Sequence, residues 1–250
     1  MRPFLADLHV HTVLSSCADD LMLPQGIVAS ALRRELSLVG IADHNSAENV
    51  AAVQAAARDT DLCIVPGMEV TTREEVHVLT LFADLDSALA WQEVIYRHLP
   101  PLRNNERAFG VQLVVNEQDE ILRVNDRLLQ TAVDLGLSQV LAEAARLGGL
   151  ALPAHVDRPA FGLIGQLGFV PPDLDAPALE VSARCNPADP TSLHPSLAGR
   201  RLLRSSDAHY LRQVGMTPSL LWLEEPTFAE LRLACLGLGG RRIDHEWHRG

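Results

Sequence analysis

The end of the first predicted strand carries residues that could bind a metal ion. Asp7, His9 and His11 alternate over the last part of an apolar run that begins at Phe4. Alternate side chains of a strand point to the same side, so we expect these three to point together. Two imidazoles directed at one place suit zinc, iron or manganese. A pair of buried, hydrogen-bonded histidines is the alternative, which this strand alone does not exclude.

Other predicted strands carry the same residue types at or next to their ends. The further candidates are Asp43, His44, Glu69, His77, His155, Asp207 and His209. One such residue is weak evidence, because single histidines and carboxylates more often have structural roles. Six of the ten histidines lie at these places, however. Since chemistry gathers at the C-terminal ends of strands in parallel barrels, the pattern predicts one shared metal centre.

The elements that must position these residues alternate along the chain. Apolar runs predict strands at 4–10, 38–42, 62–66, 76–82, 150–153, 178–181, 202–204 and 220–223, and amphipathic stretches predict helices at 24–36, 47–58, 87–98, 126–134, 138–147 and 227–236. This alternation is typical of an α/β fold with parallel strands. No glycine-rich dinucleotide fingerprint follows the first strand, which favours a barrel over an open sheet.

Composition limits the partners of the protein. The chain has 250 residues, 47% of them hydrophobic, and no apolar run that could cross a bilayer, so a single globular domain without membrane contact is expected. No signal peptide is evident, which predicts a cytoplasmic location. The net charge of −11 makes long nucleic acids unlikely partners and is compatible with a small phosphorylated substrate or a short oligonucleotide. The sequence predicts no oligomeric state.

The cysteines do not form a metal-binding motif of their own. The four are far apart and include no CxxC pair, so no thiolate zinc site is expected. Cys17 nevertheless lies close in sequence to the candidate site and is retained as a minor candidate for reactivity.

In this combination and order, the motifs resemble those of the PHP (polymerase and histidinol phosphatase) domain family. The resemblance extends from Asp7 to about Gly215, and its motifs are Asp-Leu-His-x-His at 7–11, Asp-His at 43–44, Gly-Met-Glu at 67–69, Val-His-Val at 76–78, Ala-His at 154–155 and Ser-Asp-Ala-His at 206–209. It implies a distorted, TIM-like (β/α)7 barrel as one domain over 1–250. An inserted segment is expected at about 100–147, and a polar tail from about 239.

The resemblance also implies two or three divalent metal ions, of manganese, zinc or iron. Eight of the nine family ligands correspond to His9, His11, His44, Glu69, His77, His155, Asp207 and His209. The ninth is usually an aspartate five residues after the second histidine, where this chain has Ser16. Counting back from Pro24 places Asp19 at that position, with Asp20 as a competitor.

Phosphoester hydrolysis is the activity that the resemblance implies. We expect a small phosphorylated metabolite or nucleotide to be hydrolysed by a metal-activated hydroxide. The alternatives are a 5′-exonuclease on short oligonucleotides and a non-catalytic metal-binding module, and the near-complete ligand set argues against the module.

Some residues are expected to assist this reaction without a fixed assignment. Asp207, His209 or His44 could transfer the proton, and Asp7 and Asp43 could orient neighbouring imidazoles. The guanidinium groups of Arg158 and Arg184, which follow strands on the predicted site face, are expected to bind phosphate.

Overall fold

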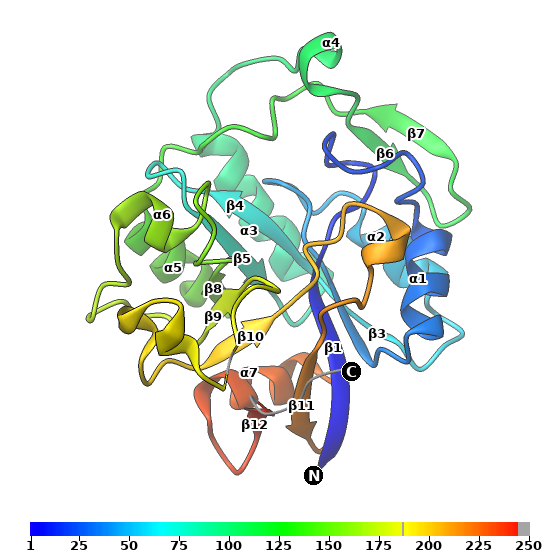
Figure 1. The fold of residues 1–250 in the computed structure, drawn as a ribbon. Coiled ribbons are helices and arrows are strands. Elements are labelled where there is room, and N and C mark those ends of the chain that lie inside the picture. Colours follow the sequence, from blue (N-terminus) through cyan, green and yellow to red (C-terminus); the bar gives the residue numbers. More distant parts are fainter. Residues whose placement is uncertain (187, 245–250) are drawn as a thin grey trace.

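The strands form four sheets within the part of the chain that the structure describes, and five of them are buried along their whole length (Figure 1). The computed structural model describes residues 1–186 and 188–244. The largest sheet has the order β12 (Arg242–Asp244), β11 (Ser219–Leu223), β1 (Arg2–Val10), β2 (Leu38–Ile41) and β3 (Cys63–Val65). The others are β4 (Gly67–Thr71) with β5 (His77–Leu81) and β8 (Leu150–Pro153), β9 (Leu179–Val181) with β10 (Leu202–Arg204), and β6 (Leu113–Val115) with β7 (Ile121–Val124).

Helices lie outside the sheets and follow local sequence signals. They are α1 (Pro24–Arg33), α2 (Val50–Ala56), α3 (Leu85–His98), α4 (Glu106–Phe109), α5 (Leu137–Arg146), α6 (Leu163–Leu167) and α7 (Phe228–Leu236), with 3-10 turns at Pro190–Ser192, Pro195–Leu197 and Leu211–Gln213. Pro24 occupies the first turn of α1, where its missing N–H costs nothing. Asp84 and Thr227 cap α3 and α7 by accepting hydrogen bonds from backbone N–H groups. The α/β prediction is confirmed.

One predicted helix is wrong. The stretch 126–134 contains no helix in the structure as described. Its backbone is tied instead to side chains and loops outside the stretch: the N–H of Leu129 donates to Oε1 of Gln112, and the carbonyl of Arg127 accepts from Nε2 of the same glutamine. These contacts compete with the i→i−4 ladder, so helix propensity is overridden.

Strand direction also differs from the prediction. β1, β2 and β3 are parallel, as are β9 and β10, but β4, β5 and β8 pair antiparallel. The reason for the first antiparallel pair is the short connection between β4 and β5, which is closed by a hydrogen bond from the N–H of Thr72 to the carbonyl of Val76. A parallel pairing would need a crossover of a dozen or more residues.

The sheets share one interior but no continuous ladder closes them within the described ranges. Single bridges connect them instead: His44 with Glu69 between β2 and β4, and Val10 with Ala208 between β1 and the segment after β10. A closed barrel is therefore not confirmed.

Two apolar clusters fill the space on the two faces of the strands. The inner cluster includes Phe4, Leu8, Leu79, Leu152 and Leu203, and α7 contributes Phe228 and Leu231 to it. The outer cluster packs α1, α2, α3 and α5 against the opposite faces of the strands. Strands buried on both faces read as near-continuous apolar runs, which is why their positions could be predicted.

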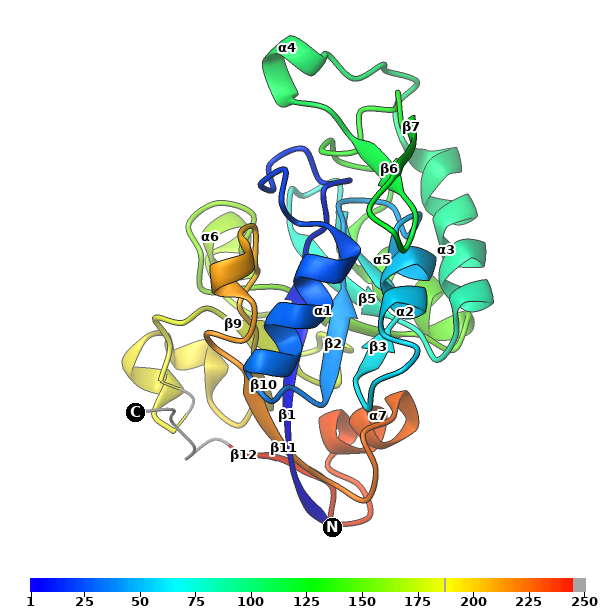
Figure 2. The same cartoon turned by 90° about the vertical axis from the view of Figure 1, so that its right-hand side faces the viewer.

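The segment 100–125 carries α4 and the β6–β7 hairpin and projects beyond the strands (Figures 1 and 2). The predicted insertion at about 100–147 also includes α5, which packs on the outer cluster. Among the described residues, no helix is both long and apolar enough to traverse a bilayer. The cytoplasmic location stays a prediction. Of the polar tail predicted from about 239, residues 245–250 lie outside the described part, and β12 lies within it.

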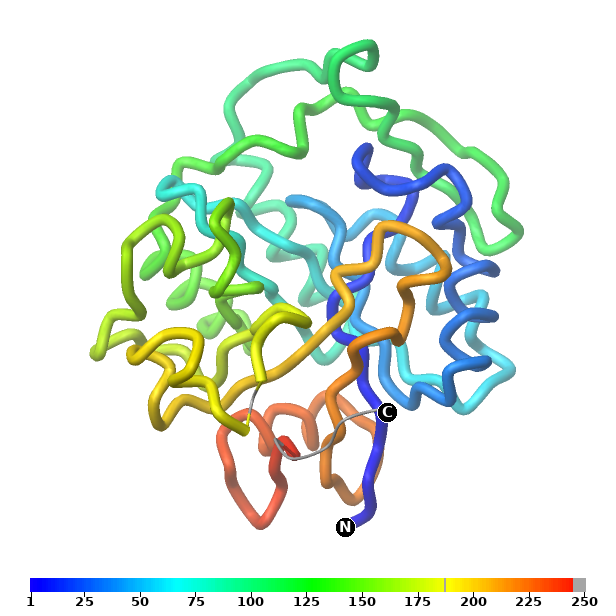
Figure 3. The backbone as a smooth tube through the Cα atoms, viewed as in Figure 1, coloured from blue at the N-terminus to red at the C-terminus, as the bar shows by residue number. Residues whose placement is uncertain are grey.

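Asp7 joins β1 to a segment near the end of the sequence. Its buried carboxylate accepts hydrogen bonds from the N–H (2.9 Å) and hydroxyl (2.6 Å) of Ser206 and from the N–H of Gly215 (2.7 Å). The tube drawing shows this segment running beside β1 (Figure 3). The expectation that Asp7 points with His9 and His11 is therefore wrong.

The reason is an irregularity in β1. The register between β1 and β2 shifts between Asp7 and Val10, which interrupts the strict alternation of side chains. The two backbones also approach so closely that a Cβ on Gly40 would lie 2.2 Å from the carbonyl oxygen of Leu8.

We predict that Asp7→Ala lowers the free energy of unfolding by about 3 kcal/mol or more, because it leaves three donors without their acceptor. Urea denaturation would measure the change. Asp20→Ala, at an exposed position, is the matched control and should stay within about 0.5 kcal/mol of the wild type. Equal free energies of unfolding for the two variants would contradict a stabilising role of the Asp7 hydrogen bonds.

Candidate metal centre

The buried carboxylate of Glu69 lies at the centre of five imidazoles. Glu69 is 1% exposed and comes from the middle of β4. The nitrogen-to-oxygen distances are 2.7 Å for Nδ1 of His77, 3.0 Å for Nε2 of His155, 3.0 Å for Nδ1 of His44, 3.3 Å for Nε2 of His9 and 3.6 Å for Nε2 of His11. Residues from β1, β4 and β5 and from the segments just after β1, β2 and β8 therefore meet at one point.

A second carboxylate, that of Asp207, faces the same centre. Its Oδ1 lies 3.0 Å from Nε2 of His11, 3.4 Å from Nε2 of His9 and 3.6 Å from Nδ1 of His209. Its Oδ2 accepts a hydrogen bond from Arg158. The structure thus brings together eight of the nine predicted ligands.

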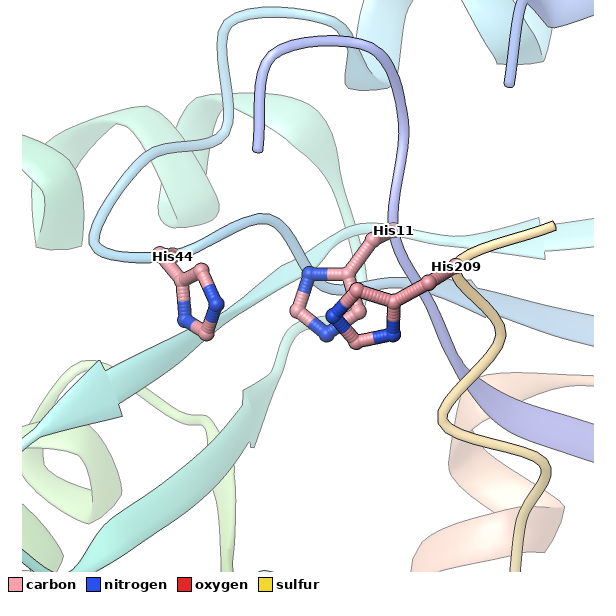
Figure 4. A group of neighbouring side chains, drawn as sticks. All are labelled: His11, His44 and His209. Carbon is pink, nitrogen blue, oxygen red and sulfur yellow. The ribbon is translucent and has the colours of Figure 1, made fainter. Parts of the chain in front are cut away.

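The donor atoms form three groups with the spacing of metal ligands. In each group the donors lie within 4.8 Å of one another; the groups are His11–His44–His209, His9–His11–Glu69 and His44–Glu69–His77. Figure 4 shows the first, in which the rings of His11 and His209 are 4.3 Å apart between centroids and those of His11 and His44 are 4.7 Å apart.

Orphaned nitrogens show that this donor set fits divalent cations. Nε2 of His9, Nδ1 of His44 and Nδ1 of His155 are buried without a hydrogen-bond partner. Leaving a buried polar atom unsatisfied costs about 1–3 kcal/mol. The His9 and His44 nitrogens nevertheless lie 3.0–3.4 Å from carboxylate oxygens. Imidazole nitrogens and carboxylate oxygens that face each other in this way are the ligands of zinc, iron and manganese.

Polar partners orient the imidazoles toward the centre. Nδ1 of His9 lies 2.9 Å from Oε2 of Glu180, a buried residue of β9. This carboxylate holds a proton at Nδ1 of His9, so Nε2, which faces Glu69 and Asp207, is the nitrogen that would bind a cation. Sequence reasoning missed Glu180; its signal was an acidic residue between Leu179 and Val181 in an apolar strand.

His11 is oriented through a relay. Its Nδ1 lies 3.0 Å from the hydroxyl of Ser15, and that hydroxyl donates to Oδ1 of Asp43 at 2.6 Å. Ser15 can therefore accept a hydrogen bond from the Nδ1–H of His11, which leaves Nε2 without a proton. Asp43 thus acts on His11 through Ser15. Its carboxylate also accepts hydrogen bonds from the N–H and the hydroxyl of Thr12.

Two of the candidate ligands have left-handed backbone conformations. His155 has a φ of 29° and Asp207 a φ of 47°, a region that is uncommon for residues with a Cβ. Both follow directly on short strands, β8 and β10, where the chain turns. Strain of this kind persists where the surroundings fix it and is concentrated at functional sites.

The charges in the centre support one another. Burial alone would raise the pKa of the Glu69 carboxyl, but His77 and His9, with hydrogen bonds from His155 and His44, hold it well below its usual range. For Asp207, burial is likewise outweighed by His9 and His11, which hold its pKa well below the ordinary value. Both groups are therefore ionised, as metal-ligating carboxylates must be.

The ninth expected ligand is placed differently from the other eight. The carboxylate of Asp19 accepts a hydrogen bond from the N–H of Leu21 at 3.0 Å, and Asp19 belongs to none of the three donor groups. Asp20 is exposed. Besides Ser15, the side chain of Cys17 in this loop also reaches the histidines, because its Sγ lies 3.3 Å from Nε2 of His44.

A pocket of about 810 Å³ opens over the centre. Its wall includes His44, His77, His155, Asp207 and His209, together with Cys17, Glu180, Phe161 and both predicted phosphate-binding arginines, Arg158 and Arg184. Positive guanidinium groups and anionic ligands thus lie on one concave surface, which is the arrangement needed to bind an anion beside cations.

No known family profile matches this chain, and no curated protein sequence matches it. Solved structures do. Endonuclease Q, a lesion-specific endonuclease from Pyrococcus furiosus, is 21% identical over 97% of this chain with a TM-score of 0.68. A structure of endonuclease Q with a 27-mer duplex that has an abasic lesion at the active site is 20% identical over 97%, with a TM-score of 0.69. This chain spans 58% of the length of endonuclease Q in both cases.

The fold is also shared with shorter proteins. A proposed metal-dependent phosphoesterase from Bifidobacterium adolescentis is 19% identical, over 82% of this chain and 87% of its own, with a TM-score of 0.53. An amidohydrolase from Chromobacterium violaceum with bound sulfate is 18% identical, over 85% and 90%, with a TM-score of 0.52. At these identities the likeness establishes a common fold, and the fold occurs with more than one kind of hydrolysis.

We predict that Glu180→Ala lowers the affinity for the metal about 10–100-fold, because His9 loses the partner that fixes its tautomer and ring orientation. Competition with a chelator of known affinity would measure this. Glu143→Ala, on the exposed side of α5, is the matched control. An unchanged affinity in Glu180→Ala would refute the orienting role.

Proposed function

We propose that this protein is a metal-dependent phosphoester hydrolase that acts on a small phosphorylated metabolite or nucleotide. The observation that carries the proposal is the position of Glu69: a buried, ionised carboxylate within 3.6 Å of five imidazoles, below a pocket that contains two arginines. Membership of the PHP family, which the motifs suggested, is part of this proposal. The shared fold of a proposed phosphoesterase supports it.

The residues that would hold two or three divalent ions are those of the three donor groups together with His155 and Asp207. Glu69, His11 and His44 each belong to two of these groups. Manganese, zinc and iron are the candidates. When bound, such ions supply Lewis acidity and lower the pKa of a coordinated water.

The chain itself would bind and orient the phosphoryl group. Arg184 reaches the pocket from the segment after β9, and Arg158 lies beside Asp207. A planar guanidinium can donate two parallel hydrogen bonds to phosphate oxygens. Both arginines are therefore proposed to hold the substrate above the centre, with its reacting phosphorus toward Glu69 and Asp207.

Asp207, His209 and His44 stay the proposed catalytic residues for proton transfer. Their side chains are 6%, 24% and 10% exposed, so His209 is the most accessible to solvent. Burial opposes a charged imidazole at His209, but Cys17 and Asp207 outweigh it and raise its pKa. A group of this kind can hold a proton near neutral pH and release it to a leaving oxygen.

We also propose that the whole chain forms a single, distorted seven-stranded barrel. Support comes from the shared inner cluster and from the bridges that join neighbouring sheets. A further link is the hydrogen bond from the N–H of Val156, just after β8, to the carbonyl of Glu180 in β9.

We predict that the chelated protein is inactive and that manganese, zinc or iron(II) restores hydrolysis of a phosphoester panel. Glu69→Gln should reduce kcat/KM by about 100-fold or more, because the charge that gathers the histidines is lost. Glu143→Gln is the surface control. Steady-state assays on phosphomonoesters, bisphosphates and dinucleotides, with metal analysis of each preparation, would measure the effects.

The outcomes separate the candidate functions. Metal-loaded protein that hydrolyses none of the panel would identify a non-catalytic metal-binding module. Protein that takes up no metal after reconstitution would overturn the proposal altogether.

A nucleic-acid substrate is the second candidate, because an exposed aromatic ring lies at the pocket. Phe161 is 41% exposed and stacks on His77 with 4.4 Å between ring centroids and 18° between planes. Its φ of 58° is unusual for a bulky residue, and its carbonyl accepts from the N–H of His77 at 2.9 Å. An aromatic face fixed beside a phosphate site can stack a nucleobase.

The likeness to endonuclease Q supports this second candidate. It means that the negative net charge alone does not exclude DNA as the substrate. A 5′-exonuclease on short oligonucleotides, which the sequence analysis gave as an alternative, and an endonuclease on lesion-containing DNA are both compatible with Phe161.

We predict that Phe161→Ala raises KM for oligonucleotides about 10-fold, since stacking contributes about 1–3 kcal/mol per base. The KM for alkyl phosphates, which have no ring to stack, should stay unchanged. Arg184→Ala should lower kcat/KM for both substrate classes. Phe169→Ala, another exposed phenylalanine outside the pocket, is the matched control. Equal losses on both substrate classes in Phe161→Ala would contradict base stacking.

A further inference from the structure

We propose that the thiolate of Cys17 is a metal ligand, together with His44 and His209, in the place where a carboxylate from Asp19 was expected. The proposal rests on the proposed function and deepens it, because it assigns a sulfur donor to one part of the centre. Nothing in the cysteine spacing indicated it, since no CxxC pair is present.

The position of the sulfur is the first support. Sγ of Cys17 lies 3.3 Å from Nε2 of His44 and lines the pocket with His44 and His209. The other nitrogen of His44, Nδ1, lies 3.0 Å from Oε2 of Glu69. His44 therefore has one ring nitrogen directed to the Glu69 side of the centre and the other to Cys17.

The neighbouring histidines are the second, independent support. Donor atoms of His11, His44 and His209 lie within 4.8 Å of one another. His44 is 8% exposed, and its Nε2, the nitrogen that faces Cys17, is the one available to an ion on this side of the centre. Nδ1 of His209 lies 2.9 Å from the carbonyl oxygen of Asp207, so its proton is held there and Nε2 is free to bind a cation.

The backbone of the loop explains why cysteine, and not aspartate, faces the histidines. The N–H of Ala18 donates to the carbonyl of Ser15, and the N–H of Asp19 donates to the carbonyl of His209 at 2.8 Å. This second bond fixes the loop against the segment that carries His209. The Asp19 carboxylate is used locally by Leu21, which leaves Cys17 as the donor on the pocket side.

A sulfur ligand changes which metal this part of the centre prefers. Thiolates favour zinc and iron over magnesium and manganese, whereas carboxylates suit the harder ions. Three protein ligands with an open fourth position are typical of catalytic zinc sites. We therefore expect a softer ion here than in the part of the centre that Glu69 and Asp207 serve.

Cobalt(II) substitution of the full chain tests the proposal directly. Wild type, Cys17→Ser, Asp19→Asn and the control Cys63→Ser would be loaded with cobalt(II), and their absorption spectra and metal content recorded. A thiolate ligand gives an intense near-ultraviolet sulfur-to-cobalt charge-transfer band. We expect the band in wild type, Asp19→Asn and Cys63→Ser, and its loss with about one fewer ion per chain in Cys17→Ser.

Alkylation of the wild type gives a readout that needs no variant. Iodoacetamide followed by peptide mass analysis should modify Cys17 in the chelated protein and at least 10-fold more slowly after metal loading. Equal rates in both states, or a charge-transfer band that survives in Cys17→Ser, would overturn the proposal. Loss of an ion in Asp19→Asn but not in Cys17→Ser would assign the carboxylate instead.

The same spectra keep this inference separate from the proposed function. A wild type that binds cobalt(II) and shows only ligand-field bands would refute Cys17 as a ligand and leave the metal centre intact. A wild type that binds no cobalt(II) would refute both.

Discussion

The structure depends on one buried charge. A carboxylate in the interior is costly unless opposite charge or donors surround it, and Glu69 lies in the middle of β4 with five imidazoles around it. Each imidazole comes from a strand or from the residues just after one. The requirement to stabilise this carboxylate therefore fixes how the ends of these strands converge, and the pocket with its arginines lies over the same point.

Residues around the centre determine how its histidines are oriented. Glu180 holds His9, and Asp43 holds His11 through Ser15. Neither carboxylate needs to touch a cation to matter, because each determines which ring nitrogen of its histidine carries the proton. The strained backbone at His155 and Asp207 belongs to the same requirement, since both side chains must turn inward directly after a strand ends.

Much of this could be predicted from the sequence, for physical reasons. Strands buried on both faces are continuous apolar runs, and His44, His155 and Asp207 follow such runs directly, so their gathering was predictable. The direction of β4, β5 and β8 was not, because 67–71 was not predicted as a strand, so the short connection that makes β4 and β5 antiparallel could not be recognised. The register shift in β1 turned Asp7 away from His9, and no composition signal marks such a shift.

The loop before α1 shows that the sequence also does not determine which loop side chain faces the site. Counting residues favoured Asp19, but the orientation of a loop side chain depends on tertiary hydrogen bonds such as that between Asp19 and His209. Prediction of the substrate is limited for another reason. The fold is shared by an endonuclease, a proposed phosphoesterase and an amidohydrolase, so only the pocket side chains can select among reactions.

The hydrogen bonds between Asp7 and Ser206 have a consequence for how the candidate metal centre would assemble. His9 and Glu180 are 171 positions apart, and His11 and Asp207 are 196 apart. No partial chain that lacks the region around residue 207 can assemble the complete ligand set. Contacts of such long sequence separation are slow to form, and ions that bind only the finished arrangement stabilise it by mass action. Metal binding would thus be a late step in folding, because it requires that the N-terminal strand and the region around residue 207 are already in contact.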